Sequence, residues 1–462
     1  MTYAFTFDAS ACTGCKACQM ACKDKNNLPV GVLWRRVFEV SGGGWQKEGA
    51  AWASNVFAYN LSIACNHCVH PKCAGVCPTD AYVQREDGIV YIDGSKCMGC
   101  GYCAWACPYS VPQYNPERGH MTKCNFCMDE LDQGKPPACV AACPMRVLDY
   151  TVISEQSSVS SEQFAVIGGG YQALWEIEAT EHPFPLPAFS RTQPHLAMRP
   201  HPAMRNGLEK VIANREEIRP RQESGWEELP LMAFTLLTQM AAGIAIAGLF
   251  FPLSTFHVLA IGALLGLGGL ASFLHLGTKK NAWRAVLHWQ KSWLSREILA
   301  FALFGLCWLA WVLEHWLLNT DYCSLMTALL GLAVVYSMIQ VYRLRAVPGW
   351  NTWRTEAAFF LSAGILGLMG ISFGAGLASA WLPLWVLLVL EARLALSAEN
   401  PAGKTVERIR AVCIVLAMVG VSLLPLAPDS VQASLNPPIL LAIWSEQILG
   451  RWLFYRARIP AL

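Results

Sequence analysis

Residues 97–108 read Cys97-Met-Gly-Cys100-Gly-Tyr-Cys103-Ala-Trp-Ala-Cys107-Pro108. Three cysteines, each separated from the next by two residues, can hold one face of a cubane iron–sulfur cluster. In proteins that carry two such clusters, a fourth cysteine, three residues farther on and followed by proline, ligates the neighbouring cluster. This stretch therefore predicts 4Fe-4S sites that exchange a ligand.

Related cysteine patterns occur four times before residue 144, and together they use sixteen of the nineteen cysteines. Group one is Cys12, Cys15, Cys18 and Cys22; group two is Cys65, Cys68, Cys73 and Cys77; group three is Cys97, Cys100, Cys103 and Cys107; group four is Cys124, Cys127, Cys139 and Cys143. A disulfide framework is disfavoured because no secretory signal precedes Cys12. Zinc is disfavoured because its sites rarely add a third cysteine at the same spacing and a Cys-Pro pair. We therefore expect four 4Fe-4S clusters.

The fourth cysteine of each group should cross over to another cluster. Exchange between groups two and three gives Cys65, Cys68, Cys73 with Cys107, and Cys97, Cys100, Cys103 with Cys77. Exchange between groups one and four gives Cys12, Cys15, Cys18 with Cys143, and Cys124, Cys127, Cys139 with Cys22. Residues 1–152 are thus predicted to form an α+β double-ferredoxin-like domain, with short strands such as 56–63 and 88–92 between the groups.

Several basic residues lie near these cysteines in sequence: Lys16, Lys23, Lys72, Lys96 and Lys123. A nearby positive charge can raise a cluster's reduction potential, but a solvated surface position is the favoured interpretation for most of them. His67 and His70 in group two are expected near the surface or behind the ligands rather than as ligands themselves.

Residues 153–225 lose the cysteines and gain Pro, Ser, His and Arg, which predicts an extended arm or linker. The glycines at 168–170 formally match a dinucleotide fingerprint, but no second strand follows to complete a βαβ unit, so a loop is favoured. The chain's net charge of +2 gives no support for nucleic-acid binding.

The C-terminal half, residues 226–462, is a series of apolar stretches about as long as a membrane-spanning helix of ~20 residues. They are apolar on all sides, unlike the helices of a soluble bundle. We expect an eight-helix transmembrane bundle over 229–251, 256–276, 297–317, 323–342, 357–378, 380–396, 411–427 and 437–455.

Charge predicts the orientation of this bundle, because Lys and Arg concentrate in short cytoplasmic loops. The loops after the second, fourth and sixth stretches and the C-terminal tail carry fourteen basic residues, whereas the loops near 252–256, 315–323, 379–380 and 428–436 carry none. The fourteen are Lys279, Lys280, Arg284, Lys291, Arg296, Arg343, Arg345, Arg354, Arg393, Lys404, Arg408, Arg410, Arg456 and Arg458. The iron–sulfur domain is thus predicted on the cytoplasmic face of the inner membrane.

Ionisable residues at membrane depth are candidates for function. His275 ends the second stretch and Glu297 begins the third, so both are expected at the cytoplasmic end, where they could take the protons of a quinol. Glu446 and Arg451 in the last stretch form a second candidate pair. His257 and His315 lie at the opposite end, and no set of facing histidines indicates haem, so none is expected.

The sequence resembles the dimethyl sulfoxide reductase family, a group of complex iron–sulfur molybdoenzymes. The first 205 residues are similar to its electron-transfer subunit, through Cys-Thr-Gly-Cys-Lys-Ala-Cys18, Cys-Pro-Tyr-Ser-Val-Pro-Gln-Tyr114 and Gly-His-Met-Thr-Lys-Cys124. Residues 226–462 are similar to its membrane anchor, through Ala-Ser-Phe-Leu-His275, Ser-Arg-Glu297-Ile and Glu446-Gln-Ile-Leu-Gly-Arg451. Two normally separate subunits are therefore fused.

The resemblance implies a large molybdopterin-containing catalytic subunit that this chain does not encode, and a quinone or menaquinol site. It favours His275 and Glu297 for that site, because both match the anchor's quinol pocket. It also implies a 4Fe-4S cluster at Cys100, where nitrate reductase relatives have tryptophan and a 3Fe-4S cluster.

The predicted function is electron transfer between membrane quinone and a molybdopterin subunit, with no catalytic group for the terminal substrate in this chain. Three alternatives stay open: a periplasm-facing dimethyl sulfoxide reductase subunit, a haem-containing or ion-translocating quinone oxidoreductase subunit, and a redox-sensing transporter. The loop charges favour a cytoplasmic substrate such as sulfite or nitrate over the first alternative. Scarce intramembrane charge disfavours the last.

Overall fold

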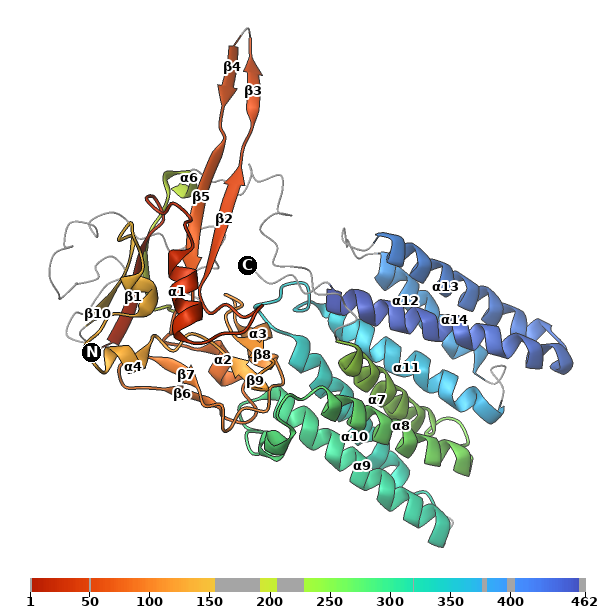
Figure 1. Ribbon diagram of the computed structural model, residues 1–462. Helices are drawn as coiled ribbons and strands as arrows, with labels where there is room; N and C mark the ends of the chain where they lie inside the picture. Colours follow the sequence, from red (N-terminus) through yellow and green to blue (C-terminus); the bar gives the residue numbers. More distant parts are fainter. Residues whose placement is uncertain are drawn as a thin grey trace. The chain divides into compact units, whose positions relative to one another are not determined.

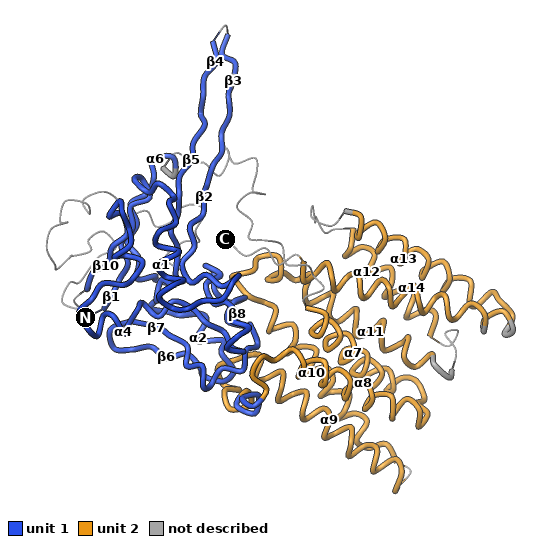
Figure 2. The backbone as a smooth tube through the Cα atoms, viewed as in Figure 1, with its two compact units in different colours: residues 1–221, 280–284, 460–462 blue, residues 222–279, 285–459 orange. Residues whose placement is uncertain are grey.

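The computed structural model describes residues 2–49, 51–153, 192–205, 228–318, 320–375, 380–396 and 404–456. It divides into two compact units (Figure 2): unit 1 comprises residues 1–221, 280–284 and 460–462, and unit 2 comprises residues 222–279 and 285–459. Most of the predicted arm, including the glycines at 168–170, lies outside the described residues.

Unit 1 is closed by its first strand. Strand β1 (Thr2–Asp8) lies between β10 (Leu148–Ile153), to which it is antiparallel, and β11 (Leu196–Arg199), to which it is parallel. Figure 1 shows these segments, distant in sequence, side by side. Phe5 and Phe7 of β1 are buried in the unit's main core, next to Leu148 and Met198. Backbone pairing and this core thus join the two ends of the cysteine-rich region.

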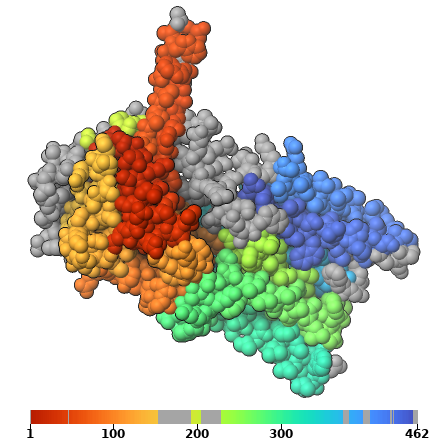
Figure 3. Space-filling model, in the orientation of Figure 1, coloured from red at the N-terminus to blue at the C-terminus, as the bar shows by residue number. Residues whose placement is uncertain are grey.

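A long two-stranded hairpin projects from unit 1 (Figures 1 and 3). Strand β2 (Arg36–Gly42) pairs with β5 (Phe57–Ile63), and farther out β3 (Trp45–Glu48) pairs with β4 (Ala51–Ser54). At its base, Leu61 and Ile63 are buried in the core. Its outer part is exposed, including Trp45 and Trp52.

The remaining elements of unit 1 are short and stand beside the cysteine groups. The helices are α1 (Ala17–Lys25), α2 (Lys72–Gly75), α3 (Tyr102–Ala106), α4 (Met128–Leu131), α5 (Ala138–Ala141) and α6 (Pro202–Arg205). Two small hairpins, β6 (Tyr82–Gln84) with β7 (Val90–Ile92) and β8 (Gln113–Asn115) with β9 (His120–Thr122), complete the unit. The strands expected over 56–63 and 88–92 correspond to β5 and β7.

Unit 2 is helical. Its helices are α7 (Leu229–Ala247), α8 (Thr255–Leu274), α9 (Trp293–Leu318), α10 (Cys323–Tyr342), α11 (Trp353–Ala375), α12 (Trp381–Leu396), α13 (Lys404–Leu423) and α14 (Asp429–Arg456), with a short 3-10 turn at Leu424–Leu426. A second 3-10 turn, Lys279–Val286, contains the residues 280–284 that belong to unit 1. Helix α7 packs against α8, α10 and α11. Where α7 meets α11, Gly243 and Gly367 bring the two backbones into contact, leaving no room for a Cβ on either residue.

Every one of the eight apolar stretches coincides with one of these helices. Six helices in the described part of the chain are long and apolar enough to span a membrane: α7, α8, α9, α10, α11 and α13, the last with the turn that follows it. Helix α12 is only 16 residues long, and α14 contains Pro437 and Pro438 and a polar first half. The structure therefore supports six candidate spans rather than the predicted eight.

Candidate functional site

The loops that carry the cysteines share one backbone feature. In each Cys-x2-Cys segment of groups one to four, the residue before the second cysteine has a positive φ: Gly14, His67, Gly99 and Phe126. The left-handed turn is inexpensive for glycine but unusual for histidine and phenylalanine. In three groups the backbone N–H of this residue faces the first cysteine's sulfur, at 3.5 Å for Cys65 and 3.4 Å for Cys97 and Cys124. The turn therefore curls the loop around its own sulfur.

In three groups a proline follows the last cysteine. Cys107 ends helix α3 with an extended backbone, φ −81° and ψ 116°. Pro108 explains this, because the residue before a proline is disfavoured in the helical region. Pro78 and Pro144 follow Cys77 and Cys143 in the same way.

The structure brings the cysteines together in four sets that cross between the groups. Each set is named here by its lowest-numbered member: the Cys12 set (Cys12, Cys15, Cys18, Cys143), the Cys22 set (Cys22, Cys124, Cys127, Cys139), the Cys65 set (Cys65, Cys68, Cys73, Cys107) and the Cys77 set (Cys77, Cys97, Cys100, Cys103). These are the four combinations that the group pattern predicts. The ligand role of each thiol stays a prediction.

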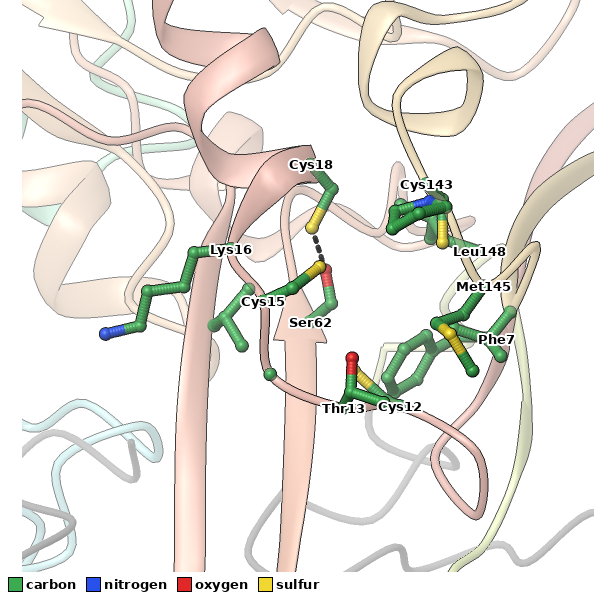
Figure 4. A pocket seen from close by; sticks show the side chains of 14 residues that line it. Phe7, Cys12, Thr13, Cys15, Lys16, Cys18, Ser62, Cys143, Met145 and Leu148 are labelled. Atoms are coloured by element: carbon green, nitrogen blue, oxygen red, sulfur yellow. Dashed lines mark hydrogen bonds between the residues drawn. The ribbon is translucent and has the colours of Figure 1, made fainter.

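The Cys12 set lines a hollow that Figure 4 shows from close by. Cys15, Cys18 and Cys143 come from two distant loops and point into it, and Cys15 is exposed to solvent. Ser62, at the base of the hairpin, places its hydroxyl 3.3 Å from the Cys18 sulfur. Apolar side chains such as Phe7 and Leu148 form much of the rest of the wall.

Burial changes the chemistry of the thiols. It raises the pKa of Cys100 to about 12 and that of Cys107 to about 11. A thiol at such a site is neutral at pH 7 unless a metal holds its thiolate form, so cluster binding must release protons. No three His, Cys, Asp or Glu side chains among the described residues converge as single-ion ligands would. A 4Fe-4S cluster instead takes four cysteines. Four all-cysteine sets fit it, and in three of them a backbone N–H lies beside a cysteine sulfur.

Two buried cations lie among the thiols, and sequence reasoning missed their position. Lys123 is 3% exposed, and its Nζ lies 3.3 Å from the Cys65 sulfur. Arg35 is 2% exposed and donates from Nη1 to the Ser62 hydroxyl at 3.1 Å. Burial opposes the charge of both, yet nearby cysteines, Cys65 for Lys123 and Cys139 for Arg35, hold both pKa values above the usual range. Both side chains therefore carry a positive charge.

The other lysines noted in the sequence are less enclosed. Lys72 and Lys16 are exposed or nearly so, Lys96 pairs with Asp93 at 3.7 Å, and Lys23 donates to the Pro29 carbonyl at 2.8 Å. His70 is exposed. His67 is buried, and its Nδ1 accepts the backbone N–H of Val90 at 3.0 Å.

In unit 2, Glu446 and Arg451, the second candidate pair for the quinol site, have different partners. Glu446 is fully buried and accepts from Arg410 at 2.8 Å, and Arg410 also pairs with buried Glu391. Arg451 donates to Gln239 at 2.7 Å and lies over the Phe359 ring at 3.9 Å. Arg410 of α13 therefore belongs to a buried ionic triad with Glu391 of α12 and Glu446 of α14, not to a charged loop. Thirteen of the fourteen cations assigned to the loops and the tail remain.

The other candidate pair lies at adjoining helix ends. His275 caps the C-terminus of α8, and Glu297 follows in the first turns of α9, where it is 3% exposed. At the opposite end of α8, His257 accepts or donates within a capping box with Ser254, at 2.8 Å. His315 lies 3.1 Å from Asp321.

Comparison with known proteins separates the sequence into the same two parts. Residues 56–153 match the family described as a 4Fe-4S dicluster domain, and residues 222–416 match the DMSO reductase anchor subunit (DmsC). The B subunit of the anaerobic dimethyl sulfoxide reductase of Escherichia coli strain K12 is 45% identical over 199 residues, which cover 43% of this protein and 89% of that relative. This protein belongs to the dimethyl sulfoxide reductase family.

Other members of this family match the same N-terminal part. The probable anaerobic dimethyl sulfoxide reductase subunit YnfG of Escherichia coli K12 is 43% identical over 218 residues, covering 47% of this protein and 98% of the relative. The thiosulfate reductase electron transfer subunit PhsB of Salmonella typhi is 39% identical over 156 residues, covering 33% and 77%. This protein is thus an iron–sulfur electron-transfer subunit of the dimethyl sulfoxide reductase family, fused to a DmsC-like membrane anchor.

Proposed function

We propose that this protein carries electrons between a membrane quinone pool and a molybdopterin-containing catalytic subunit through four 4Fe-4S clusters, one at each cysteine set. The observation that carries the proposal is the crossing of the sets: each pairs three thiols of one group with one of another, as in ferredoxin-type two-cluster domains. The clusters supply one-electron redox chemistry when bound. The protein's part is to hold them in a buried, cross-linked domain.

The quinol site of this proposal is at His275 and Glu297, with Glu446 and Arg451 as the second candidate. Oxidising a quinol releases two electrons and two protons, so the site needs a proton acceptor where the quinol oxygen binds. Glu297 is a buried carboxylate for which no hydrogen bond is found among the described residues, and it lies in the first turns of a long apolar helix. It is therefore available for a quinol hydroxyl.

We expect a Glu297→Gln variant to slow quinol-driven reduction of the clusters by about 100-fold, a typical contribution of a proton acceptor. Stopped-flow bleaching of the iron–sulfur absorbance by a reduced quinone analogue measures this rate in purified protein. The matched control is Glu356→Gln. Glu356 lies in the first turn of α11, and its half-exposed carboxylate pairs with Arg343. Equal rates in Glu297→Gln and the wild type would exclude Glu297 from the site.

We further propose that the protein crosses the inner membrane eight times, with the iron–sulfur unit on the cytoplasmic face. Six spans meet the length and hydropathy that a bilayer requires. Helices α12 and α14 would be the other two. The thirteen cations left after removing Arg410 lie in alternate loops, in the helix turns that border those loops, or in the C-terminal tail. This distribution is typical of the cytoplasmic side.

The hairpin offers a direct test of sidedness. Insertion of a specific protease site between Glu48 and Ala51, at an exposed hairpin tip, should leave the core of unit 1 unaffected. We expect cleavage in inverted membrane vesicles and none in intact spheroplasts. Cleavage in spheroplasts alone would place the iron–sulfur unit outside the cytoplasm and favour a periplasmic S- or N-oxide reductase. The same protein without the inserted site, which the specific protease should not cleave, serves as the control in both preparations.

A further inference from the structure

The Lys123 amine lies between two of the cysteine sets. Its Nζ contacts the Cys65 sulfur at 3.3 Å and donates to the carbonyl of Cys124 at 3.1 Å and to that of Val90. Its closest electrostatic neighbours are the thiols of Cys65, Cys73 and Cys124. The first two belong to the Cys65 set and the third to the Cys22 set.

The Arg35 guanidinium also lies between two cysteine sets, the Cys12 set and the Cys22 set. Its Nη1 donates to the Ser62 hydroxyl, which in turn lies 3.3 Å from the Cys18 sulfur of the Cys12 set. Its other electrostatic neighbours include Cys22, Cys124 and Cys139 of the Cys22 set. The guanidinium carbon lies 4.6 Å from the centre of the Phe5 ring. Nε and Nη2 are buried and find no acceptor in the described part of the chain, so both are free to donate toward sulfur.

We propose that Lys123 and Arg35 are buried positive charges that raise the reduction potentials of the clusters on either side of them. Lys123 acts at the junction between the Cys65 and Cys22 sets. Arg35 acts at the junction between the Cys22 and Cys12 sets. This inference rests on the proposed function, because it requires clusters at the four sets. It gives the sets an order: Cys77, Cys65, Cys22, Cys12. The Cys22 set lies between both cations and the Cys77 set next to neither.

The physical basis is charge in a medium of low polarizability. Reduction adds a negative charge to a cluster, and a cation close by stabilises that charge much more strongly in the protein interior than in water. Cluster potentials respond to net charge and to hydrogen bonds at the sulfurs. A solvated lysine at the same distance from a cluster changes its reduction potential only weakly, because water and salt screen the charge. Burial therefore separates Lys123 and Arg35 from the surface lysines near the other cysteines.

The test is EPR-monitored redox titration of the full-length protein, in the wild type and in Lys123→Gln and Arg35→Gln variants. The four couples are first assigned by cysteine variants of each set. In Lys123→Gln the couples of the Cys65 and Cys22 sets should shift to lower potential. At a fixed potential, their reduced-to-oxidised ratio should fall by about tenfold, or about 59 mV for a one-electron couple. In Arg35→Gln the couples of the Cys22 and Cys12 sets should shift to lower potential. The couple of the Cys77 set should shift in neither variant.

Two kinds of control separate charge from general disturbance. Lys72→Gln removes the same charge from an exposed lysine that directly precedes Cys73, and it should leave all four potentials nearly unchanged. Lys123→Arg and Arg35→Lys keep the positive charge, so the reduction potentials of these variants should stay close to those of the wild type. Unchanged potentials in the glutamine variants, or an equal shift in Lys72→Gln, would overturn the proposal.

Iron content distinguishes this inference from the function beneath it. About sixteen irons per protein molecule in the wild type support four cubanes, and a much lower value would refute the proposed function itself. If the glutamine variants fail to assemble their clusters, a measurement on the wild-type protein still tests the role of Lys123. Lys123 is the one lysine of the described residues whose amine contacts a cysteine sulfur. Protein labelled with 15N-lysine should show hyperfine coupling between that nitrogen and a reduced cluster, and its absence would refute the role of Lys123.

Discussion

A Cys107→Ser variant should lose the same cluster as a Cys73→Ser variant and keep the cluster that Cys103→Ser removes. Cys103 is much nearer to Cys107 in sequence, and both belong to helix α3 or its end. The extended backbone before Pro108, however, turns Cys107 toward Cys65, Cys68 and Cys73. The short helix and the proline together therefore split one cysteine run between two clusters.

The measurement is the low-temperature EPR spectrum of the reduced protein. The signal missing from Cys107→Ser should equal the signal missing from Cys73→Ser, and each variant should contain about four fewer irons than the wild type. Because the path then lacks one cluster, quinol-driven electron transfer to an acceptor beyond it should stop. The control is Cys323→Ser at the start of α10, outside the four groups, which should keep every signal. If Cys107→Ser instead matched Cys103→Ser, the crossing of groups two and three would be wrong.

Local patterns made the grouping of the cysteines predictable. Each Cys-x2-Cys turn and each Cys-Pro end is determined by residues next to one another, so the spacing alone indicated which thiols would meet. The cations at the junctions could not be found in this way. Lys123 is buried because Cys65 and Val90, from other loops, surround its amine, and Arg35 because Ser62 and Phe5 do. Nothing near Lys123 in sequence distinguishes it from exposed Lys72.

In the membrane half, hydropathy predicted helices but not how their charges pair. All eight apolar stretches are helical, because a long apolar run leaves its backbone no other internal hydrogen bonds. The partners of Glu446 depend on how α12, α13 and α14 pack, and spacing along one helix does not show them. Arg410 was counted with the loops since it lies near a polar segment. Its burial depends on Glu391 and Glu446, which belong to other helices.

This triad gives the second large expected effect. Arg410→Met should destabilise unit 2 by about 3–5 kcal/mol, because it leaves two carboxylates with 2% and 0% side-chain exposure without their cation. Gln447 donates to Glu446 at 2.5 Å but cannot neutralise it. Thermal unfolding in detergent measures the loss. Arg343→Met, which breaks the half-exposed pair with Glu356, should cost only about 0–1 kcal/mol. Equal stability of Arg410→Met and the wild type would mean that the carboxylates are already neutral.

A compensated variant then separates folding from quinol chemistry at Glu446. Replacing the whole triad, as Glu391→Leu with Arg410→Met and Glu446→Leu, should recover most of the lost stability, since a buried ion pair exchanged for apolar side chains of similar volume is often nearly neutral. Quinol-driven cluster reduction is measured in the same protein. If the rate also recovers, the triad is structural and Glu297 remains the proton acceptor. If stability recovers and the rate does not, a charged group of the triad belongs to the quinol site, with Glu446 as the candidate, because the charges of the triad are the property still missing.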